Sequence, residues 1–232
     1  MRIGILCSIP EERKHFNLIK DSAQKFGGRT FFKSKNHHHE LIVVECGLGK
    51  VNAAIASTLL IQKFKCKLLI FSGIAGGIDP DMRIGDVLIG ESIIQYDYGA
   101  KINSKIQVFR AGKVPMGASK NKIDFRLNPK IKKLIEQQLP HLRMGKILTG
   151  DVFLQCDETR KTLFKKFRAQ AIDMESGAVV QVAEQFKTIA IVVRCLSDLA
   201  NTKEKKMAFK NIKQASEISY KTVEALLKIL KE

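Results

Sequence analysis

The segment Ile189–Val193 consists of five consecutive apolar residues, four of them β-branched. Such a run suits a strand that is covered on both faces, because neither side of it then meets water. The segment Lys67–Ser72 has a similar apolar character. Buried strands of this kind favour a sheet that lies between layers of helices. Arg194 and Asp198 follow the first run, so a cation and a carboxylate stand at the end of a buried strand.

The rest of the chain alternates segments that are typical of strands with segments that are typical of helices. The sequence predicts strands over residues 3–7, 29–35, 41–46, 67–72, 87–95, 143–148 and 189–193. It predicts helices over residues 11–26, 52–64, 130–138, 175–186 and 209–230, and a long polar loop over residues 96–124. This alternation predicts an α/β fold with a mixed, twisted central β-sheet flanked by helices on both faces. We find no break in composition and expect a single domain over residues 1–232.

Length, cysteine content and the lengths of the apolar runs indicate the kind of compartment in which the chain folds. A chain of 232 residues can bury most of its apolar surface without disulfides or metal. The five cysteines are odd in number, scattered and without a CxxC spacing, which indicates buried thiols in a reducing compartment. The N-terminus lacks the pattern of a signal peptide, and no apolar stretch reaches the ~20 residues of a membrane span. We therefore expect a soluble cytoplasmic protein with no membrane partner.

The formal net charge of +17 is the strongest deviation in the composition. Basic residues are dense at residues 63–67, 160–168 and 203–210. One interpretation is a polyanion partner such as nucleic acid. The other is a solvated, Lys-rich surface, which we favour because no basic helix or aromatic-interleaved patch stands out.

Two glycine-rich turns each follow a predicted strand. "CGLGKVNAA" (46–54) lacks both the phosphate-loop and the dinucleotide-binding spacings, so alone it indicates only a tight turn. "FSGIAGGID" (71–79) fits a ligand site and a simple turn equally well. The motif "NHHHE" (36–40) invites a metal interpretation, but adjacent side chains of a strand point to opposite faces. We therefore expect no metal there.

Carboxylates follow other predicted strands. Glu175 lies among small and apolar residues in "AIDMESGAVVQVA" (171–183), so we expect it to be partly buried and to need a partner such as paired hydroxyls. Glu11 and Glu12 come directly after the first strand and would ordinarily be surface charges. Ligands of such folds bind beyond the carboxyl ends of the strands, where Asp198 also stands.

Six short motifs, in order along the whole chain, together resemble one protein family. They are "MRIGILCSIPEE", "VECGLGKVNAA", "FSGIAGGIDPDMRIGDVLI", "TGDVFLQ", "DMESGAVVQVA" and "RCLSDLAN". The chain resembles the 5′-methylthioadenosine/S-adenosylhomocysteine nucleosidases of the nucleoside phosphorylase/hydrolase superfamily. The resemblance implies hydrolysis of an N-glycosidic bond, release of adenine, no cofactor and a homodimer.

The resemblance also implies roles for individual residues. Asp198 matches the general acid that protonates adenine, Glu12 the residue that orients the attacking water, and Glu175 the carboxylate that binds the ribose hydroxyls. The remaining matches are substrate contacts: Met174 beside the sugar, Phe153 and Leu154 at adenine, Phe209 as a lid aromatic, and Leu48 with Pro115 of the partner subunit around the 5′ group.

The chain departs from the family pattern at Ser176–Gly177 and Asn201, and at two places that bear on the substrate. Ile74 stands in "SGIAGG" where the family usually has a small hydroxyl residue, which removes a polar contact. The loop 96–116 matches poorly, so the preferred 5′ substituent stays open. The alternatives are a purine nucleoside phosphorylase of the same superfamily and a basic polyanion-binding protein on this scaffold. We favour hydrolysis over phosphorolysis because "LLIFSG" offers no cation for phosphate and Glu12 would repel it.

The expected chemistry explains why a buried strand would end in a carboxylate. Adenine is a poor leaving group until a ring nitrogen is protonated, and an ordinary aspartate is ionised at pH 7. Desolvation at the end of a buried strand raises the pKa of a carboxyl group and suits it to act as an acid. We therefore expect Asp198 to donate the proton while Glu12 acts from a different strand end.

Overall fold

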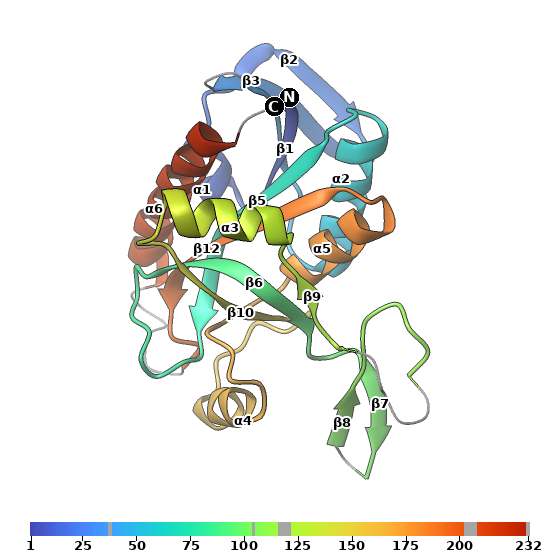
Figure 1. Ribbon diagram of the computed structural model, residues 1–232, viewed down its shortest axis with the longest axis vertical. Helices are drawn as coiled ribbons and strands as arrows, with labels where there is room; N and C mark the ends of the chain where they lie inside the picture. Colours follow the sequence, from blue (N-terminus) through green and yellow to red (C-terminus); the bar gives the residue numbers. More distant parts are fainter. Residues whose placement is uncertain (37–38, 104, 116–121, 202–207, 231–232) are drawn as a thin grey trace.

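The computed structural model describes residues 1–36, 39–103, 105–115, 122–201 and 208–230, and its centre is a twisted mixed sheet (Figure 1). The strands are β1 Arg2–Cys7, β2 Ile19–Phe26, β3 Arg29–Asn36, β4 His39–Glu45, β5 Leu68–Gly77, β6 Val87–Gln95, β7 Gly99–Ile102, β8 Lys105–Val108, β9 Phe125–Arg126, β10 Arg143–Thr149, β11 Ala171–Asp173 and β12 Ile189–Asp198. The helices are α1 Pro10–Arg13, α2 Lys50–Gln62, α3 Pro129–Gln138, α4 Asp157–Phe167, α5 Ser176–Gln185 and α6 Ala208–Ile229.

The order of the strands brings four strand ends together at one edge of the sheet. The main path runs β11-β10-β6-β12-β5-β1-β4-β3-β2, and β12, β5, β1 and β4 are mutually parallel. Strand β11 pairs with β10 and also with the end of β5, antiparallel, through Gly76 and Gly77. The sheet therefore closes on itself over β11, β10, β6, β12 and β5. This closure places the carboxyl ends of β1, β5, β11 and β12 around a common space.

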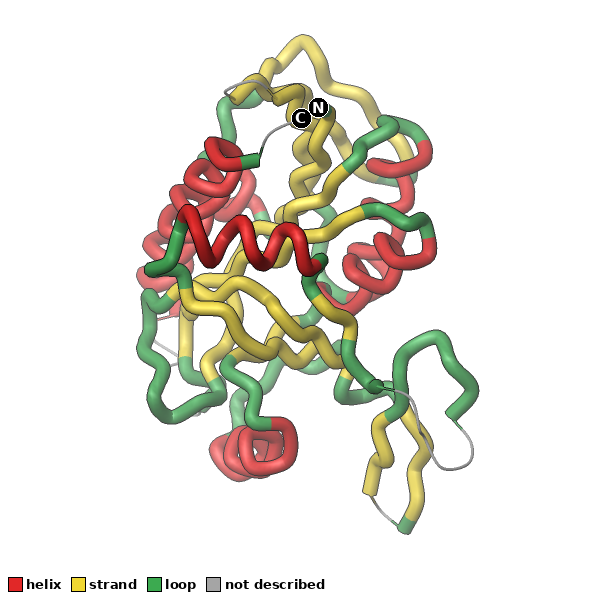
Figure 2. The backbone as a smooth tube through the Cα atoms, in the orientation of Figure 1, coloured by secondary structure: helices red, strands yellow, loops and turns green. Residues whose placement is uncertain are grey.

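Helices cover both faces of the sheet, as predicted (Figure 2). One core cluster joins α2 and α5 to the sheet and includes Leu60, Phe71 and Val179, all fully buried. A second cluster joins α6, α3 and the segment after α1 to the other face and includes Ile5 and Val193. The strand 189–193 is thus covered on both sides, which explains its uninterrupted apolar sequence.

The prediction of a helix over residues 11–26 is wrong. Only Pro10–Arg13 is helical, and β2 (Ile19–Phe26) is an edge strand that pairs antiparallel with β3. Gly27 and Gly28, with φ values of 54° and 72°, form the tight turn between these strands. A two-residue hairpin loop with positive φ at both positions favours glycine, so the pair marks a hairpin and not a helix end. The largely exposed β2 lacks the alternating pattern that would have revealed it.

Further elements differ from the predictions, among them the two-residue strand β9, which was not predicted. The predicted loop 96–124 contains the hairpin β7–β8, which extends away from the body of the molecule (Figure 1). Helix α4 was not predicted; its Leu163 and Phe167 are buried in a small core of their own. Strand β11 is only three residues long, too short for a sequence pattern. The remaining predicted strands and helices are confirmed within a few residues at their ends, apart from β5 and β12, which run five residues further.

None of the described helices is long and apolar enough to span a membrane. The single domain over residues 1–232 and the cytoplasmic location stay predictions.

Candidate active site

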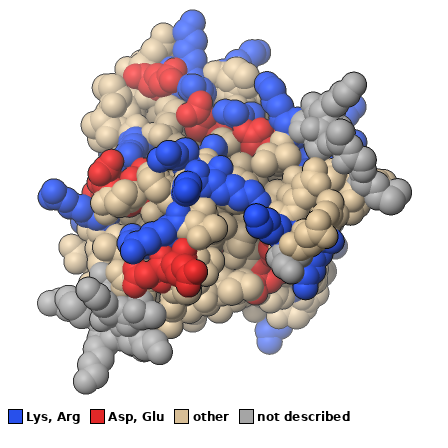
Figure 3. Space-filling view, turned by 90° about the horizontal axis from the view of Figure 1, so that it is seen from below, with Lys and Arg blue, Asp and Glu red and all other residues tan. Residues whose placement is uncertain are grey.

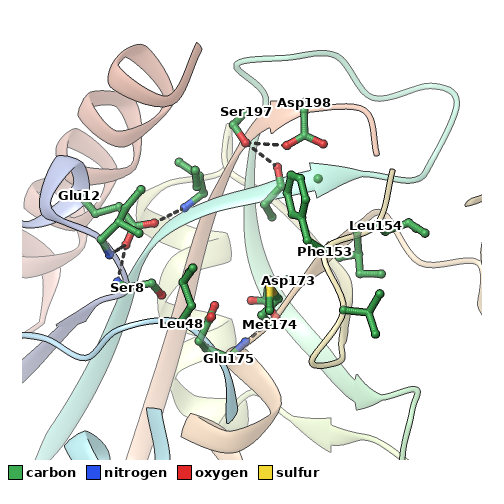
Figure 4. A pocket seen from close by; sticks show the side chains of 16 residues that line it. Ser8, Glu12, Leu48, Phe153, Leu154, Asp173, Met174, Glu175, Ser197 and Asp198 are labelled. Carbon is green, nitrogen blue, oxygen red and sulfur yellow. Dashed lines mark hydrogen bonds between the residues drawn. The ribbon is translucent and has the colours of Figure 1, made fainter. Parts of the chain in front are cut away.

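A cavity opens at the strand ends that the sheet brings together (Figure 4). Its walls come from the turn after β1, the turn before α2, the end of β5, the loop before α4, the β11–α5 junction and the end of β12. The lining residues are Ser8, Ile9, Glu12, Leu48, Ile74, Ala75, Gly76, Val152, Phe153, Leu154, Ile172, Asp173, Met174, Glu175, Ser197 and Asp198. Eight of the ten residues predicted for the site are among them.

Glu12 is buried on one wall of this cavity, although its position in sequence favoured a surface charge. Pro10 begins the one-turn helix α1 directly after β1, and this turn directs the Glu12 side chain inward. Its Oε2 accepts hydrogen bonds from the amides of Ser8 (2.5 Å) and Ile9 (3.3 Å), and its Oε1 from the amide of Ile74 (3.0 Å). Burial raises the pKa of Glu12, while Arg194 and these amides oppose the rise. The carboxylate is therefore held in place from two strand ends.

Arg194 lies beneath the carboxylates and was not predicted as a site residue. It is 1% exposed, and its guanidinium carbon lies 3.6 Å from the centre of the Phe71 ring. Gly73 provides the space for it: a Cβ there would stand 2.3 Å from Arg194 Nη1 and 2.4 Å from Glu12 Oε1. Arg194 Nη2 also lies 3.8 Å from Glu175 Oε2. A lone cation at the end of an apolar strand was the signal in the sequence.

Glu175 is buried at the N-cap of α5, as its apolar surroundings predicted. Its Oε1 accepts a hydrogen bond from the amide of Gly49 at 2.7 Å, so the first glycine-rich turn contributes to the site. Burial, reinforced by the negative charge of Asp173, raises the pKa of Glu175 to about 7, while Arg194 opposes the rise. A carboxyl group with this pKa changes its charge near neutral pH.

Asp198 stands across the cavity from Glu12 (Figure 4). Its Oδ2 accepts a hydrogen bond from Ser197 Oγ at 2.9 Å, and its Oδ1 accepts one from the amide of Ala200 at 2.8 Å. Asp198 is only half-buried, so it is less enclosed than the strand before it suggested. Gly76 allows β5 to approach closely, because a Cβ there would lie 3.1 Å from Asp198 Oδ1.

Apolar side chains form the other walls. Phe153 and Leu48 are 63% and 57% exposed at the mouth of the cavity, whereas Leu154 is buried. Met174 and Ile74 are half-buried in its lining. These five predicted residues therefore do come together around one space.

The last two predicted residues are Phe209 and Pro115. The side chain of Phe209, in the first turn of α6, lies outside the described residues. Pro115 is described and half-buried, but it does not line the cavity of its own chain.

The described residues contain no group of His, Cys, Asp and Glu side chains that could hold a metal ion. His39, the described member of the histidine run, is buried and serves the fold. Its Nε2 donates to the carbonyl oxygens of Leu230 and Leu227, at 2.9 and 3.2 Å, at the end of α6. Of the rest of the histidine motif, residues 37 and 38 lie outside the described chain.

Comparison with known proteins identifies the family. A profile of the phosphorylase superfamily matches residues 2–232. A 5′-methylthioadenosine/S-adenosylhomocysteine nucleosidase of Staphylococcus haemolyticus is 33% identical over 234 residues, which cover 98% of this chain and 100% of that protein. The chain belongs to the 5′-methylthioadenosine/S-adenosylhomocysteine nucleosidase family of the phosphorylase superfamily. Both the resemblance inferred from the motifs and the predicted fold class are thereby confirmed, and membership of this family makes the chain an N-ribosyl hydrolase.

Solved structures agree with this nucleosidase assignment. The S-adenosylhomocysteine nucleosidase of Streptococcus pyogenes, in complex with 5-methylthiotubericidin, shares 25% identity and a TM-score of 0.86, and the match covers 100% of this chain and 98% of that one. The futalosine hydrolase of Helicobacter pylori shares 26% identity and a TM-score of 0.84, over 99% and 98% of the two chains. The nucleosidase fold therefore extends over the whole chain.

Proposed function

We propose that the chain hydrolyses the N-glycosidic bond of 5′-methylthioadenosine and S-adenosylhomocysteine, with Asp198 as general acid and Glu12 orienting the water. The observation that carries this proposal is the placement of Glu12, Glu175 and Asp198 on three walls of one cavity (Figure 4). A reaction that breaks a bond to a sugar needs an acid at the leaving group and a base at the opposite face. These separate walls allow the two groups to act on opposite sides of the sugar.

The proposed reaction proceeds as follows. The bond between C1′ and N9 breaks, its electron pair leaves with adenine, and Asp198 donates a proton to N7. A water oxygen forms the new bond to C1′, and its proton passes to the Glu12 carboxylate. The products are adenine and the 5′-thioribose. General acid–base catalysis of this kind contributes roughly 10²–10⁴-fold.

Glu12 suits the role of base because of its surroundings. Its three amide hydrogen bonds fix the orientation of the carboxylate, and burial raises its pKa above the ordinary value. A base is most effective when its pKa lies near the working pH. The ionised form is still stabilised by Arg194, which stands beside it over Gly73.

Glu175 suits the role of ribose ligand. One carboxylate can accept hydrogen bonds from two neighbouring hydroxyls, which fixes the sugar between acid and base. Phe153, exposed at the mouth, offers a face for stacking on adenine, and the adjacent Leu154 offers backbone hydrogen-bonding groups. A nucleosidase of Helicobacter pylori in which one aspartate is replaced by asparagine was solved with 5′-methylthioadenosine in its active site; that chain is 26% identical, with a TM-score of 0.83 and 99% coverage of both chains.

Water is favoured over phosphate as the nucleophile. No Lys or Arg is among the described residues that line the cavity. The nearby Arg194 donates from Nε to Asp173 at 2.8 Å and is surrounded by carboxylates. A phosphate dianion would have to approach Glu12 and Glu175 with no Lys or Arg among the described lining residues to bind it. Adenine release that does not depend on phosphate is the expected result.

The group at the 5′ position determines which nucleoside is the preferred substrate, and a comparison of kcat/KM values tests the preference. Leu48 and Ile74 give the cavity apolar walls that suit a thioether, whereas a 5′-hydroxyl would lose its hydrogen bonds there. We expect adenosine to be at least tens-fold worse in kcat/KM than 5′-methylthioadenosine. Values for 5′-methylthioadenosine, S-adenosylhomocysteine, adenosine and futalosine, measured side by side, test this. Equal values for adenosine and the thioether would contradict it.

We also propose a homodimer in which Pro115 of the partner subunit completes the 5′ pocket. Helix α2 and the turn before it expose Leu48, Val51 and Ile55, by 57%, 72% and 39%. An apolar face of this kind next to the cavity mouth suits contact with a second copy. Light scattering during turnover tests the proposal, and an active monomer would contradict it.

The basic surface is less informative. In Figure 3, Lys and Arg are spread over one face with Asp and Glu between them. Several cations are committed to ion pairs, among them Lys50 with Asp97 at 2.7 Å and Arg110 with Glu184 at 2.5 Å. A solvated surface remains the favoured interpretation, and polyanion binding stays an alternative that its salt dependence would reveal.

A further inference from the structure

Asp173 is a buried carboxylate to which neither the reaction nor the family resemblance gave a role. It is the last residue of β11, only 6% exposed, and lies beside Met174 and Glu175 in the wall of the cavity (Figure 4). We propose that Asp173 is a positioning residue: its carboxylate holds the cation that lies under Glu12 and the helix turn that carries Glu175 in one fixed arrangement. The inference rests on the proposed role of Glu175 in binding the ribose.

The hydrogen bonds of Asp173 connect three different elements. Its Oδ1 accepts from Thr149 Oγ1 of β10 at 2.7 Å and from the amides of Glu175 and Ser176 at 3.3 and 3.2 Å. Its Oδ2 accepts from Arg194 Nε of β12 at 2.8 Å and from the hydroxyl of Ser176. One side chain thus ties β10, β12 and the N-terminus of α5 together.

The first oxygen, Oδ1, determines where α5 begins. The amides of the first helical turn have no partner inside the helix, and an acceptor placed before that turn fixes its start. Asp173 provides this acceptor two residues ahead of Glu175. Glu175 itself therefore remains free of capping and accepts its hydrogen bond from Gly49 instead. The helix start and the direction of the ribose carboxylate follow from the same contact.

The second oxygen, Oδ2, neutralises a cation that would otherwise be costly to bury. Both partners of the Arg194–Asp173 ion pair are at most 2% exposed in their side chains. Removing one partner of such a pair leaves an uncompensated buried charge. With Asp173 in place, Arg194 extends over Phe71 and past Gly73, comes within 3.8 Å of Glu175 Oε2, and lowers the pKa of Glu12 by its charge. Asp173 therefore acts on both reacting walls through other groups.

The charge of Asp173 gives a readout that a purely structural role would not change. The charged groups that face Glu175 are Asp173 and Glu12, which raise its pKa, and Arg194, which lowers it. The amide of Gly49 lowers it as well, and the buried thiol of Cys46 is also adjacent. Replacing Asp173 by neutral Asn removes a negative neighbour, so the pKa of Glu175 should fall.

The experiment compares three variants by pH profiles of kcat/KM for 5′-methylthioadenosine, together with thermal unfolding. In Asp173→Asn we expect a loss on the order of 10²-fold, as for a misplaced reacting group, and an acid limb displaced to lower pH. Thr149→Val is the control that keeps the charge: it removes the hydrogen bond that the hydroxyl donates to Asp173 and the one that it accepts from the amide of Gly177, and its acid limb should stay where the wild type has it. Asp173→Glu also keeps the charge, yet moves the carboxylate by a methylene, so it should lose kcat with the limb unmoved.

The outcomes separate this inference from the proposed function. Wild-type kcat/KM in Asp173→Asn would overturn the positioning role. So would a fall in kcat/KM that comes with a lower unfolding temperature while the acid limb stays at the wild-type pH. If Asp173→Asn does not fold, Asp173→Glu decides: a folded variant with reduced kcat supports the inference, and one with wild-type kcat overturns it. A wild-type protein that releases no adenine would instead remove the proposed function itself.

Discussion

The backbone amide of Ile74 donates a hydrogen bond to Glu12 Oε1 at 3.0 Å. The end of β5 therefore fixes a carboxylate that is carried by α1, the short helix that follows β1. This contact exists because Gly73 has no side chain. A Cβ at Gly73 would lie 2.4 Å from the same oxygen and 2.3 Å from Arg194 Nη1, far inside contact distance. The glycine-rich turn of the second motif therefore leaves the space that a carboxylate and a guanidinium occupy beside each other.

Gly73→Ala should accordingly disable the site. The added methyl group must displace Glu12 or Arg194, both of them buried, and overpacking of this kind costs about 1–3 kcal/mol of the free energy of unfolding. We expect kcat to fall on the order of 10²-fold, because the water is no longer held correctly. Steady-state kinetics and chemical denaturation check this, and a variant with wild-type kcat would show that the close approach is not needed.

Asp198→Asn should keep the fold and lose the acid. Asparagine can preserve the contact with the Ala200 amide but cannot donate a proton as a carboxylic acid does. We expect kcat to fall by roughly 10²–10⁴-fold while an unreactive substrate analogue binds with unchanged Kd. Ser197→Ala is the control, since it removes the neighbouring hydroxyl at 2.9 Å and leaves the acid in place. Near-normal turnover in Asp198→Asn would exclude Asp198 as the proton donor.

Glu175→Gln should lower activity and raise the free energy of unfolding above neutral pH. The folded-state pKa of Glu175, about 7, lies above the ordinary value of 4.5. Between these values the unfolded chain ionises while the folded protein keeps its proton, so the free energy of unfolding falls as pH rises, by on the order of 3 kcal/mol at pH 8. Gln carries no charge, so the variant should gain stability over the wild type at pH 8 and gain little at pH 4. Denaturation at both pH values checks this, and an equal effect at both would contradict the assigned cause.

The fold and the site were predictable from the sequence to different extents. The buried strands could be identified because burial on both faces leaves an uninterrupted apolar run, as in Ile189–Val193. The largely exposed β2 and the three-residue β11 could not, because pairing with neighbours and not their own pattern makes them strands. Within the site, carboxylates could be placed at strand ends. The Arg194–Asp173 pair could not be predicted, because it depends on closure of the sheet and a local sequence pattern does not predict that closure.

Cys156 should be the one readily modified thiol. It is exposed, and the Thr159 hydroxyl that donates to its sulfur lowers its pKa. The other four cysteines are buried, and burial raises the pKa of each, to about 12 for Cys46, Cys66 and Cys195. We expect iodoacetamide to add one equivalent to the native protein and none to Cys156→Ser, as counted by intact mass. Rapid labelling of two or more sites would contradict the burial of the others.

The most direct test of the central claim is the fate of 5′-methylthioadenosine incubated with the purified protein in ¹⁸O-labelled water, with and without phosphate. Hydrolysis through Glu12 and Asp198 predicts adenine and 5′-methylthioribose in equal amounts, with one ¹⁸O at C1 of the sugar and no dependence on phosphate. A product that forms only with phosphate and carries it at C1, or no adenine above background, would contradict the account.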